Sequence, residues 1–165
     1  MESLYNPTLK FENEKLEIRG DEYKHIKSLR LKLYDEILIT NGQGFTVKAC
    51  LINLNSNKAD FQIQARFFNQ GELDYRLGLA LGLISDRNRL EFALEKAVEL
   101  GCTDFYPIIT KFCQKTTLNL NRLRQKSITA MKQSHRSNLI RIHNIINFDK
   151  LYSITENFKQ ILLAE

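Results

Sequence analysis

The sequence has few of the residues that mark metal sites and disulfide frameworks. Its three cysteines, Cys50, Cys102 and Cys113, form no CxxC pair, and no two cysteines or histidines lie at zinc-ligand spacing within one turn. The odd number of cysteines argues against a disulfide framework, and a reducing cytoplasmic location is the expectation. The sequence therefore predicts neither structural disulfides nor a metal centre.

Long apolar runs and phosphate-binding glycine motifs are also missing. The longest apolar run, 77–84, contains Gly78 and Gly82 and falls well short of the ~20 residues that cross a bilayer. Residues 1–10 lack the basic start and apolar stretch of a secretory signal. Neither GxGxxG nor GxxxxGK followed by Ser or Thr occurs, which excludes the two best-known nucleotide-binding loops. No membrane partner is expected.

Acidic residues are absent from the segment 105–148. All 19 Asp and Glu residues lie outside it, so the formal net charge of +5 comes from this segment and the rest of the chain is acidic overall. Charge gathered in one segment predicts a surface that meets a polyanion, most often nucleic acid. The alternative is a solvated helix face whose acidic neighbours are brought in by the fold. The basic residues of this segment are Lys111, Lys115, Arg122, Arg124, Lys126, Lys132, Arg136 and Arg141.

The first part of the chain, 1–70, has the pattern of short strands around one helix. In 59–67, apolar and polar residues alternate, as expected of a strand with one buried face. The turn at 41–44, Asn-Gly-Gln-Gly, is typical of a hairpin. The predicted elements are strands at 15–19, 35–40, 45–53 and 59–67, and a helix that runs from Asp21, as its N-cap, to Leu31. Clustered strands of this kind predict a small β-barrel.

After a polar break at 69–72, strands and helices alternate, which predicts a parallel α/β sheet. The first strand is almost wholly apolar and is expected to be covered on both faces. The next helix is expected to begin with a capping box at Asn88 and to end at Gly101. The predicted strands are 77–84, 105–109, 142–146 and 160–164, and the predicted helices are 88–100, 121–134 and 149–157. Because the chain stops at Glu165 directly after an apolar strand, we expect it to be truncated.

Four stretches of the chain carry recognisable motifs. Residues 25–35 contain HIKSLRLK followed by Asp35, residues 41–44 are NGQG, residues 91–107 contain EFALEKAVELG followed by a proline, and residues 131–136 are MKQSHR. In this order they resemble the RsmE family of ribosomal small-subunit RNA uridine-N3 methyltransferases, of the SPOUT class. The resemblance covers essentially the whole chain. One departure is Phe112, which stands where the family usually has an arginine.

The resemblance implies a PUA-like RNA-binding barrel at 1–70 and the N-terminal part of a SPOUT methyltransferase domain at 73–165. It also implies methylation of uridine N3 in 16S ribosomal RNA, S-adenosylmethionine as the methyl donor, the small ribosomal subunit or its RNA as partner, and a homodimer. In the family the donor lies in a C-terminal knot built from GPEGG and LG.RILR.ETA motifs. Neither motif occurs here, so the donor-binding residues are expected beyond Glu165.

Several polar side chains are candidates for RNA contact. Arg30 and Lys32 are placed on the first predicted helix and are expected to meet phosphates, although plain surface charge is the alternative. Gln133 and Arg136 lie one turn apart and are expected to face one way, toward RNA; the alternative is a helix C-terminal arginine favoured by the helix dipole. Glu91 and its neighbours Lys96 and Glu99 are interpreted as solvated helix pairs. The predicted RNA-binding residues are Arg30, Lys32, Lys111, Arg122, Gln133 and Arg136, and no residue is assigned to catalysis.

Three functions remain open from the sequence. The first is methylation of uridine N3 by the intact protein. The second is a non-catalytic RNA-binding protein, which applies if 165 residues is the natural length. The third is an α/β enzyme whose basic segment binds a small anionic substrate. Binding that spans several phosphates weakens steeply with salt, and this separates the third function from the first two.

Overall fold

The computed structural model describes residues 2–111, 113, 117–156 and 158–163, which group into two compact units. The first unit consists of the chain up to Glu72 together with Ile128–Leu139. The second consists of Leu73–Ser127 and the chain from Ile140 onward. The sequence prediction placed a boundary between 70 and 73 but did not include the return of 128–139 to the first unit.

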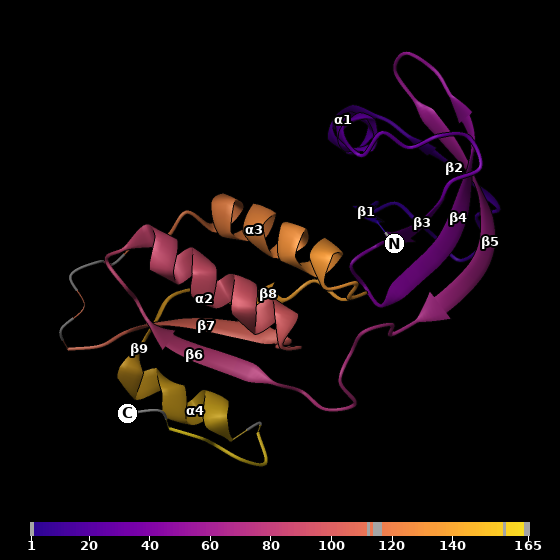
Figure 1. Ribbon diagram of the computed structural model, residues 1–165. Helices are drawn as coiled ribbons and strands as arrows, with labels where there is room; N and C mark the ends of the chain where they lie inside the picture. The colour runs from indigo at the N-terminus through magenta and orange to yellow at the C-terminus, as the bar shows by residue number, and fades with distance from the viewer. Residues whose placement is uncertain (1, 112, 114–116, 157, 164–165) are drawn as a thin grey trace. The chain divides into compact units, whose positions relative to one another are not determined.

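The first unit is built on a curved five-stranded sheet with the strand order β1-β3-β4-β5-β2 (Figure 1). Strand β1 runs parallel to β3, and the other neighbouring strands are antiparallel. This arrangement is a half-barrel and confirms the small β-barrel predicted for this part of the chain. The elements are β1 (Ser3–Tyr5), β2 (Lys15–Ile18), α1 (Gly20–Ser28), β3 (Glu36–Thr40), β4 (Phe45–Leu54) and β5 (Ala59–Phe68).

The period-two pattern of the strands places one face of the sheet in the core of this unit. Val47, Ala49 and Leu51 alternate along β4 and are all fully buried. Phe61 of β5 and Ile26 of α1 belong to the same cluster and are also fully buried. Burying a side chain such as Leu or Phe stabilises a fold by ~1.5–3 kcal/mol, so this alternation is enough to select the register.

The β3–β4 hairpin closes through the predicted turn. Gly42 and Gly44 have φ values of 71° and 87°, in the left-handed region that glycine adopts most readily. The Asn41 side chain accepts hydrogen bonds from the backbone N–H groups of Gln43, at 2.7 Å, and Phe45, at 3.2 Å. The Asn-Gly signal therefore predicted the turn for the correct physical reason.

Helix α1 is shorter than predicted at its C-terminal end, and its N-cap is different. It begins at Gly20 after Arg19, whose side chain makes no capping bond, so the predicted N-cap at Asp21 is wrong. Asp21 lies in the first turn, where a carboxylate interacts favourably with the helix dipole. The helix ends at Ser28 because Arg30 adopts φ 54°, a left-handed conformation that stops it before Leu31.

The second unit contains a parallel sheet with β7 at its centre. Strands β6, β8 and β9 each pair with β7 in parallel, which confirms the predicted α/β architecture. Helices α2 and α4 lie on opposite faces of the β6–β7 sheet (Figure 1). The elements are β6 (Gly78–Gly82), α2 (Arg87–Glu99), β7 (Asp104–Ile109), α3 (Leu120–Gln133), β8 (Arg141–Ile142), β9 (Ile146–Asn147), a 3-10 turn (Phe148–Lys150) and α4 (Leu151–Thr155).

Three strand predictions for the second unit need correction. The single strand predicted at 142–146 is replaced by β8 and β9, which are two short strands joined by 143–145. Residues 160–163 form no strand, because they make no ladder with a neighbour in the described part of the chain. Strand β6 is half-exposed, whereas the sequence predicted that both of its faces are covered. The prediction failed because apolar composition alone does not determine how many layers pack on a strand.

Helix α2 is capped by Asp86, and the capping box predicted at Asn88 is wrong. The Asp86 side chain accepts hydrogen bonds from the backbone N–H groups of Asn88, at 2.8 Å, and Arg89, at 3.3 Å. Two candidate caps two residues apart have the same sequence signature, and only the backbone geometry distinguishes them. Gly101, with φ 93°, follows the helix end as predicted.

Replacing Asp86 with alanine is expected to lower the free energy of unfolding of the second unit by about 1 kcal/mol, because two N-terminal N–H groups lose their acceptor. Amide hydrogen exchange of β7 measures this change. The matched control is Asp21→Ala, which is expected to change the stability of the first unit by less than about 0.5 kcal/mol, because Asp21 is exposed and caps nothing. An equal loss in both variants would contradict the capping assignment.

Within the described residues, every helix is too short or too polar to cross a bilayer.

Candidate functional site

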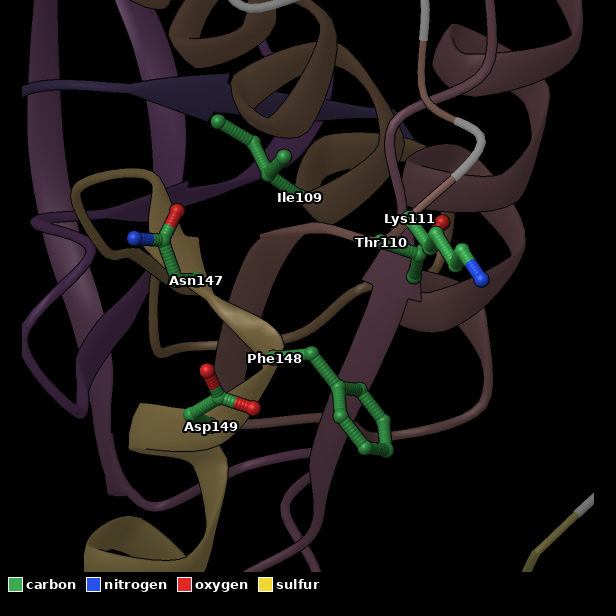
Figure 2. Close-up of a pocket in the computed structure, with 6 residues that line it drawn as sticks. All are labelled: Ile109, Thr110, Lys111, Asn147, Phe148 and Asp149. Carbon is green, nitrogen blue, oxygen red and sulfur yellow. The ribbon is translucent and has the colours of Figure 1, made fainter.

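The carboxyl edge of the parallel sheet contains a pocket. Open α/β sheets bind their ligands beyond the carboxyl ends of the strands. Here β7 and β9 end side by side, because Ile109 pairs with Asn147. Beyond them lies a pocket of about 540 Å³, shown in Figure 2. It is lined by Ile109, Thr110, Lys111, Asn147, Phe148 and Asp149.

The lining of this carboxyl-edge pocket is chemically mixed. Lys111 supplies an ammonium group, Asp149 a carboxylate and Phe148 an aromatic ring (Figure 2). Thr110 and Asn147 add a hydroxyl and an amide, which both donate and accept hydrogen bonds. A ring, a cation and neutral polar groups together suit a nucleotide, because a base can stack, a phosphate can pair and the base edge can be hydrogen-bonded.

A hydrogen-bonded thiol lies next to the pocket. The Cys113 Sγ accepts from the backbone N–H of Thr110 at 3.3 Å, lies 3.2 Å from the Thr110 hydroxyl, and donates to the Leu83 carbonyl at 3.4 Å. Bonds from the Thr110 hydroxyl and backbone lower the pKa of the Cys113 thiol. These bonds connect the loop after β7 to the end of β6. Phe112, the departure from the family motif, lies outside the described residues.

Arg122, one predicted RNA contact, forms an ion pair with Glu91 of α2. The Arg122 Nη2 donates to Glu91 Oε2 at 3.0 Å, and Lys126 Nζ lies 3.8 Å from the same carboxylate oxygen. The hydrogen bonds from Arg122 hold the pKa of the Glu91 carboxyl below its usual range, although burial opposes this shift. Glu91 is buried, so its interpretation as a solvated helix residue is wrong. The Arg122 side chain is 44% exposed, and its contact with RNA stays a prediction.

Gln133 lines a polar hollow of about 480 Å³ in the first unit. Beside it, the Lys132 ammonium lies 2.9 Å from Glu22 Oε1 and 3.2 Å from His25 Nδ1. An ammonium group only donates, so in a hydrogen bond with Lys132 the Nδ1 atom of His25 is the acceptor. The hollow is lined by Glu2, Ser3, His25, Thr129, Lys132, Gln133 and His135.

Arg136 lies inside the first unit, where it pairs with Glu72. The Arg136 Nη2 is 2.6 Å from Glu72 Oε2, and the two side chains are 2% and 7% exposed. Glu72 also accepts from the backbone N–H groups of Ser137, at 2.9 Å, and Asn138, at 2.8 Å. This burial argues against a direct phosphate contact by Arg136. Its partner lies 64 residues earlier, beyond the reach of a helical spacing argument.

The basic segment is therefore not a surface of unpaired charge. Four of its basic side chains have a carboxylate within 4.0 Å, supplied by Glu91, Glu22 or Glu72. For these four, the prediction of unpaired positive charge is wrong. The alternative, in which the fold brings acidic neighbours to this segment, is confirmed for these residues. They are Arg122, Lys126, Lys132 and Arg136. Lys115 lies outside the described residues.

The predicted contact residues divide between the two units. Lys111 and Arg122 belong to the second unit, and the remaining predicted contacts, Arg30, Lys32, Gln133 and Arg136, belong to the first. Sequence reasoning missed Asn147, the last residue of β9, and Phe148, which follows it. Their position at the carboxyl end of a parallel strand was the available signal.

An apolar groove of the second unit has a lining that does not suit S-adenosylmethionine. The second unit has an apolar groove of about 470 Å³, lined by β6 and α4 and by residues such as Tyr106, Ile108 and Phe158. Its lining contains no charged side chain, whereas the amino-acid end of this donor carries an ammonium and a carboxylate. This groove therefore offers no partner for the charged end of the donor, and a donor site beyond Glu165 stays a prediction.

The fold and the site together define a two-unit α/β protein, in which a half-barrel is followed by a parallel sheet with a polar pocket at its carboxyl edge. Known protein families match both units of the chain. The RNA methyltransferase domain family matches residues 71–165, and the RNA methyltransferase PUA domain family matches residues 18–64. The chain belongs to the RsmE family of RNA methyltransferases.

Similar proteins come from several bacteria. The ribosomal RNA small subunit methyltransferase E of Rickettsia conorii is 31% identical over 127 residues, which is 76% of this chain and 51% of the relative. The Bacillus subtilis protein of the same name is 24% identical over 154 residues, which is 89% of this chain and 60% of the relative. The crystal structure of the Neisseria gonorrhoeae protein, bound to S-adenosyl methionine, superposes with a TM-score of 0.80 at 25% identity and covers 92% of this chain and 64% of that one. The chain thus spans about half to two thirds of the length of these relatives.

Proposed function

We propose that the protein to which this chain belongs methylates N3 of a uridine in 16S ribosomal RNA with S-adenosylmethionine as donor, and that the described residues hold the RNA. The observation that carries this proposal is the carboxyl-edge pocket with Lys111, in a chain of the RsmE family. The methylating activity, the ribosomal substrate and the homodimer are taken from the family resemblance.

The chain's own side chains suit the binding part of this task. Uridine N3 is hidden inside a base pair, so the target base must be unpaired before it reacts. In the carboxyl-edge pocket, the Phe148 ring stacks on the base and Asn147 hydrogen-bonds its edge. Lys111 pairs with a neighbouring phosphate. In the first unit, Arg30, Lys32 and Gln133 contact flanking RNA. Arg136 has a supporting role: its hydrogen bond to Glu72 fixes the carboxylate that also binds the backbone N–H of Asn138.

Replacing Lys111 with alanine is expected to weaken binding of a labelled 16S ribosomal RNA fragment and to make the salt dependence shallower by about one unit in the slope of log affinity against log salt. The reason is that one phosphate contact, with its released counterion, is lost. Fluorescence anisotropy between 50 and 200 mM salt, roughly the range over which such contacts are measured, gives both numbers. The control Lys159→Ala removes an exposed lysine outside the pocket and is expected to leave the slope unchanged.

Methyl transfer tests the activity itself. The protein, expressed from its own genomic reading frame, is incubated with S-adenosylmethionine labelled on the methyl group and with small ribosomal subunits. The expected result is label on the RNA, with N3-methyluridine identified by mass spectrometry. RNA binding with no transferred label would instead support the non-catalytic RNA-binding alternative.

A further inference from the structure

The loop that follows α1 in the first unit displays an aromatic ring to solvent. Tyr34 is 77% exposed, and Arg30 and Lys32 in the same loop are exposed as well. Tyr34 contributes little to the core, because most of its surface faces water. Large exposed aromatic side chains are uncommon enough to suggest a binding surface when cations accompany them.

The backbone of this loop is held in a conformation that disfavours bulky side chains. Arg30 and Tyr34 have φ values of 54° and 74°, in the left-handed region where glycine and asparagine are preferred. The Tyr34 N–H donates to the Leu51 carbonyl at 2.8 Å, so the strand beside it fixes the backbone. An exposed tyrosine in such a position gains no packing that offsets the strain, and retained strain of this kind points to a functional role.

The two cations of the loop differ from those of the basic segment. Within the part of the chain that the structure describes, the charged side-chain nitrogens of Arg30 and Lys32 form no ion pair with a carboxylate within 4.0 Å. The nearby Asp35 carboxylate instead accepts from the backbone N–H of Lys32 at 2.7 Å, which orders the loop. Within five residues, the loop therefore presents one exposed ring and two cations that are available to an anionic ligand.

We propose that this loop binds single-stranded RNA, with the Tyr34 ring stacked on an unpaired base and Arg30 and Lys32 in contact with the adjacent phosphates. The match of residues 18–64 to an RNA methyltransferase PUA domain includes this loop and favours RNA over a protein partner. The proposal rests on the proposed function and deepens it by naming a stacking residue. Because every base has a flat face, such stacking tolerates many sequences.

The test measures binding of fluorescein-labelled octauridylate to the whole chain by anisotropy. Tyr34→Ala is expected to weaken binding about tenfold with an unchanged salt slope, since stacking releases no counterion. Tyr34→Phe keeps the ring and is expected to stay within about twofold of wild type. The matched control is Tyr152→Ala, which removes a tyrosine of similar exposure, 71%, from α4.

A direct optical readout is available because the sequence contains no tryptophan. In Tyr34→Trp the indole is the sole tryptophan, and octauridylate is expected to quench its emission, because stacked bases quench aromatic fluorescence. Tyr152→Trp provides the matched probe and is expected to show no quenching. Tyr34→Gly removes the ring and relieves the strained backbone, so this variant is expected to be as stable as wild type. If it also binds more weakly, misfolding is excluded as the cause.

Three results would overturn the proposal. Wild-type binding that Tyr34→Ala leaves unchanged removes the stacking role and leaves the proposed function intact. A change in oligomeric mass in Tyr34→Ala, with RNA affinity unaltered, makes the loop a contact between copies of the chain. A wild-type chain that binds neither octauridylate nor the ribosomal fragment overturns the proposed function together with this inference.

Discussion

Replacing Arg136 with methionine is expected to lower the free energy of unfolding of the first unit by about 3–5 kcal/mol. The Glu72 carboxylate is 7% exposed, so removal of the guanidinium leaves a buried charge without its counter-ion. Glu72 also holds the backbone of Ser137 and Asn138, so its position cannot relax freely. Amide hydrogen exchange of Val47 and Leu51, in the core of this unit, measures the change.

The matched control for Arg136 is the exposed pair of Lys58 and Glu17, whose charged atoms are 2.7 Å apart. Lys58→Met is expected to cost less than about 1 kcal/mol, because water solvates the remaining carboxylate. Adding Glu72→Gln to the Arg136 variant is expected to recover part of the loss, since an amide oxygen still accepts from the backbone. Unchanged stability with weaker RNA binding would instead favour the direct RNA contact predicted for Arg136.

Replacing Asp104 with asparagine is expected to lower the free energy of unfolding of the second unit by about 2–3 kcal/mol at pH 7. The buried Asp104 carboxylate accepts from Arg76 Nε at 2.7 Å and Nη2 at 2.9 Å, and from the Thr103 hydroxyl at 2.8 Å. It also lies 2.7 Å from His143 Nε2, and the His143 ring stacks on Tyr106 at 4.1 Å. An amide cannot accept all these bonds, so donors are left unpaired.

The Asp104 carboxyl should also make the stability of this unit depend on acid. Burial alone would raise its pKa, but hydrogen bonds from Arg76, His143 and Thr103 hold the pKa well below the usual range. The unfolded chain takes up this proton near pH 4, roughly the ordinary value, while the folded chain does not. The stabilisation is therefore complete above about pH 5 and declines as the pH falls below about 4.

Urea unfolding at pH 7 and at pH 3 checks both parts of the Asp104 prediction. The difference between wild type and Asp104→Asn is expected to be smaller at pH 3. Asp74→Asn, at an exposed aspartate of the same unit, is the control and should change stability by less than about 0.5 kcal/mol at either pH. A difference that stays constant with pH would contradict the assignment of Asp104 as an ionised, stabilised carboxylate.

Asp104 also shows why its cluster is structural. It is the first residue of β7, so Arg76 and His143 gather at the amino ends of the parallel strands. The carboxyl-edge pocket, with Lys111, lies at the opposite ends of the same strands. Ligands of parallel sheets bind at the carboxyl ends, so a strong ion network at the amino ends stabilises the unit without competing with the binding site.

Local patterns predicted much of the fold. The alternation along β5 and the Asn-Gly turn at 41–44 identify strands and a hairpin, because side-chain direction and backbone preference depend on neighbouring residues only. Element ends were less certain, as the cap at Asp86 shows, because adjacent polar residues have similar capping tendencies. The order of motifs in the chain was sufficient to indicate the RsmE family.

The pairing of charges and the exposure of single rings depended on the tertiary structure. Lys132 meets Glu22 across 110 residues of sequence, and no periodicity relates two positions that far apart. The left-handed backbone of Tyr34 is likewise set by its hydrogen bond to Leu51, 17 residues away on β4. Strand patterns and family motifs are properties of neighbouring residues and can be read along the chain. Whether a cation is neutralised or faces solvent depends on distant segments that meet only when the chain folds.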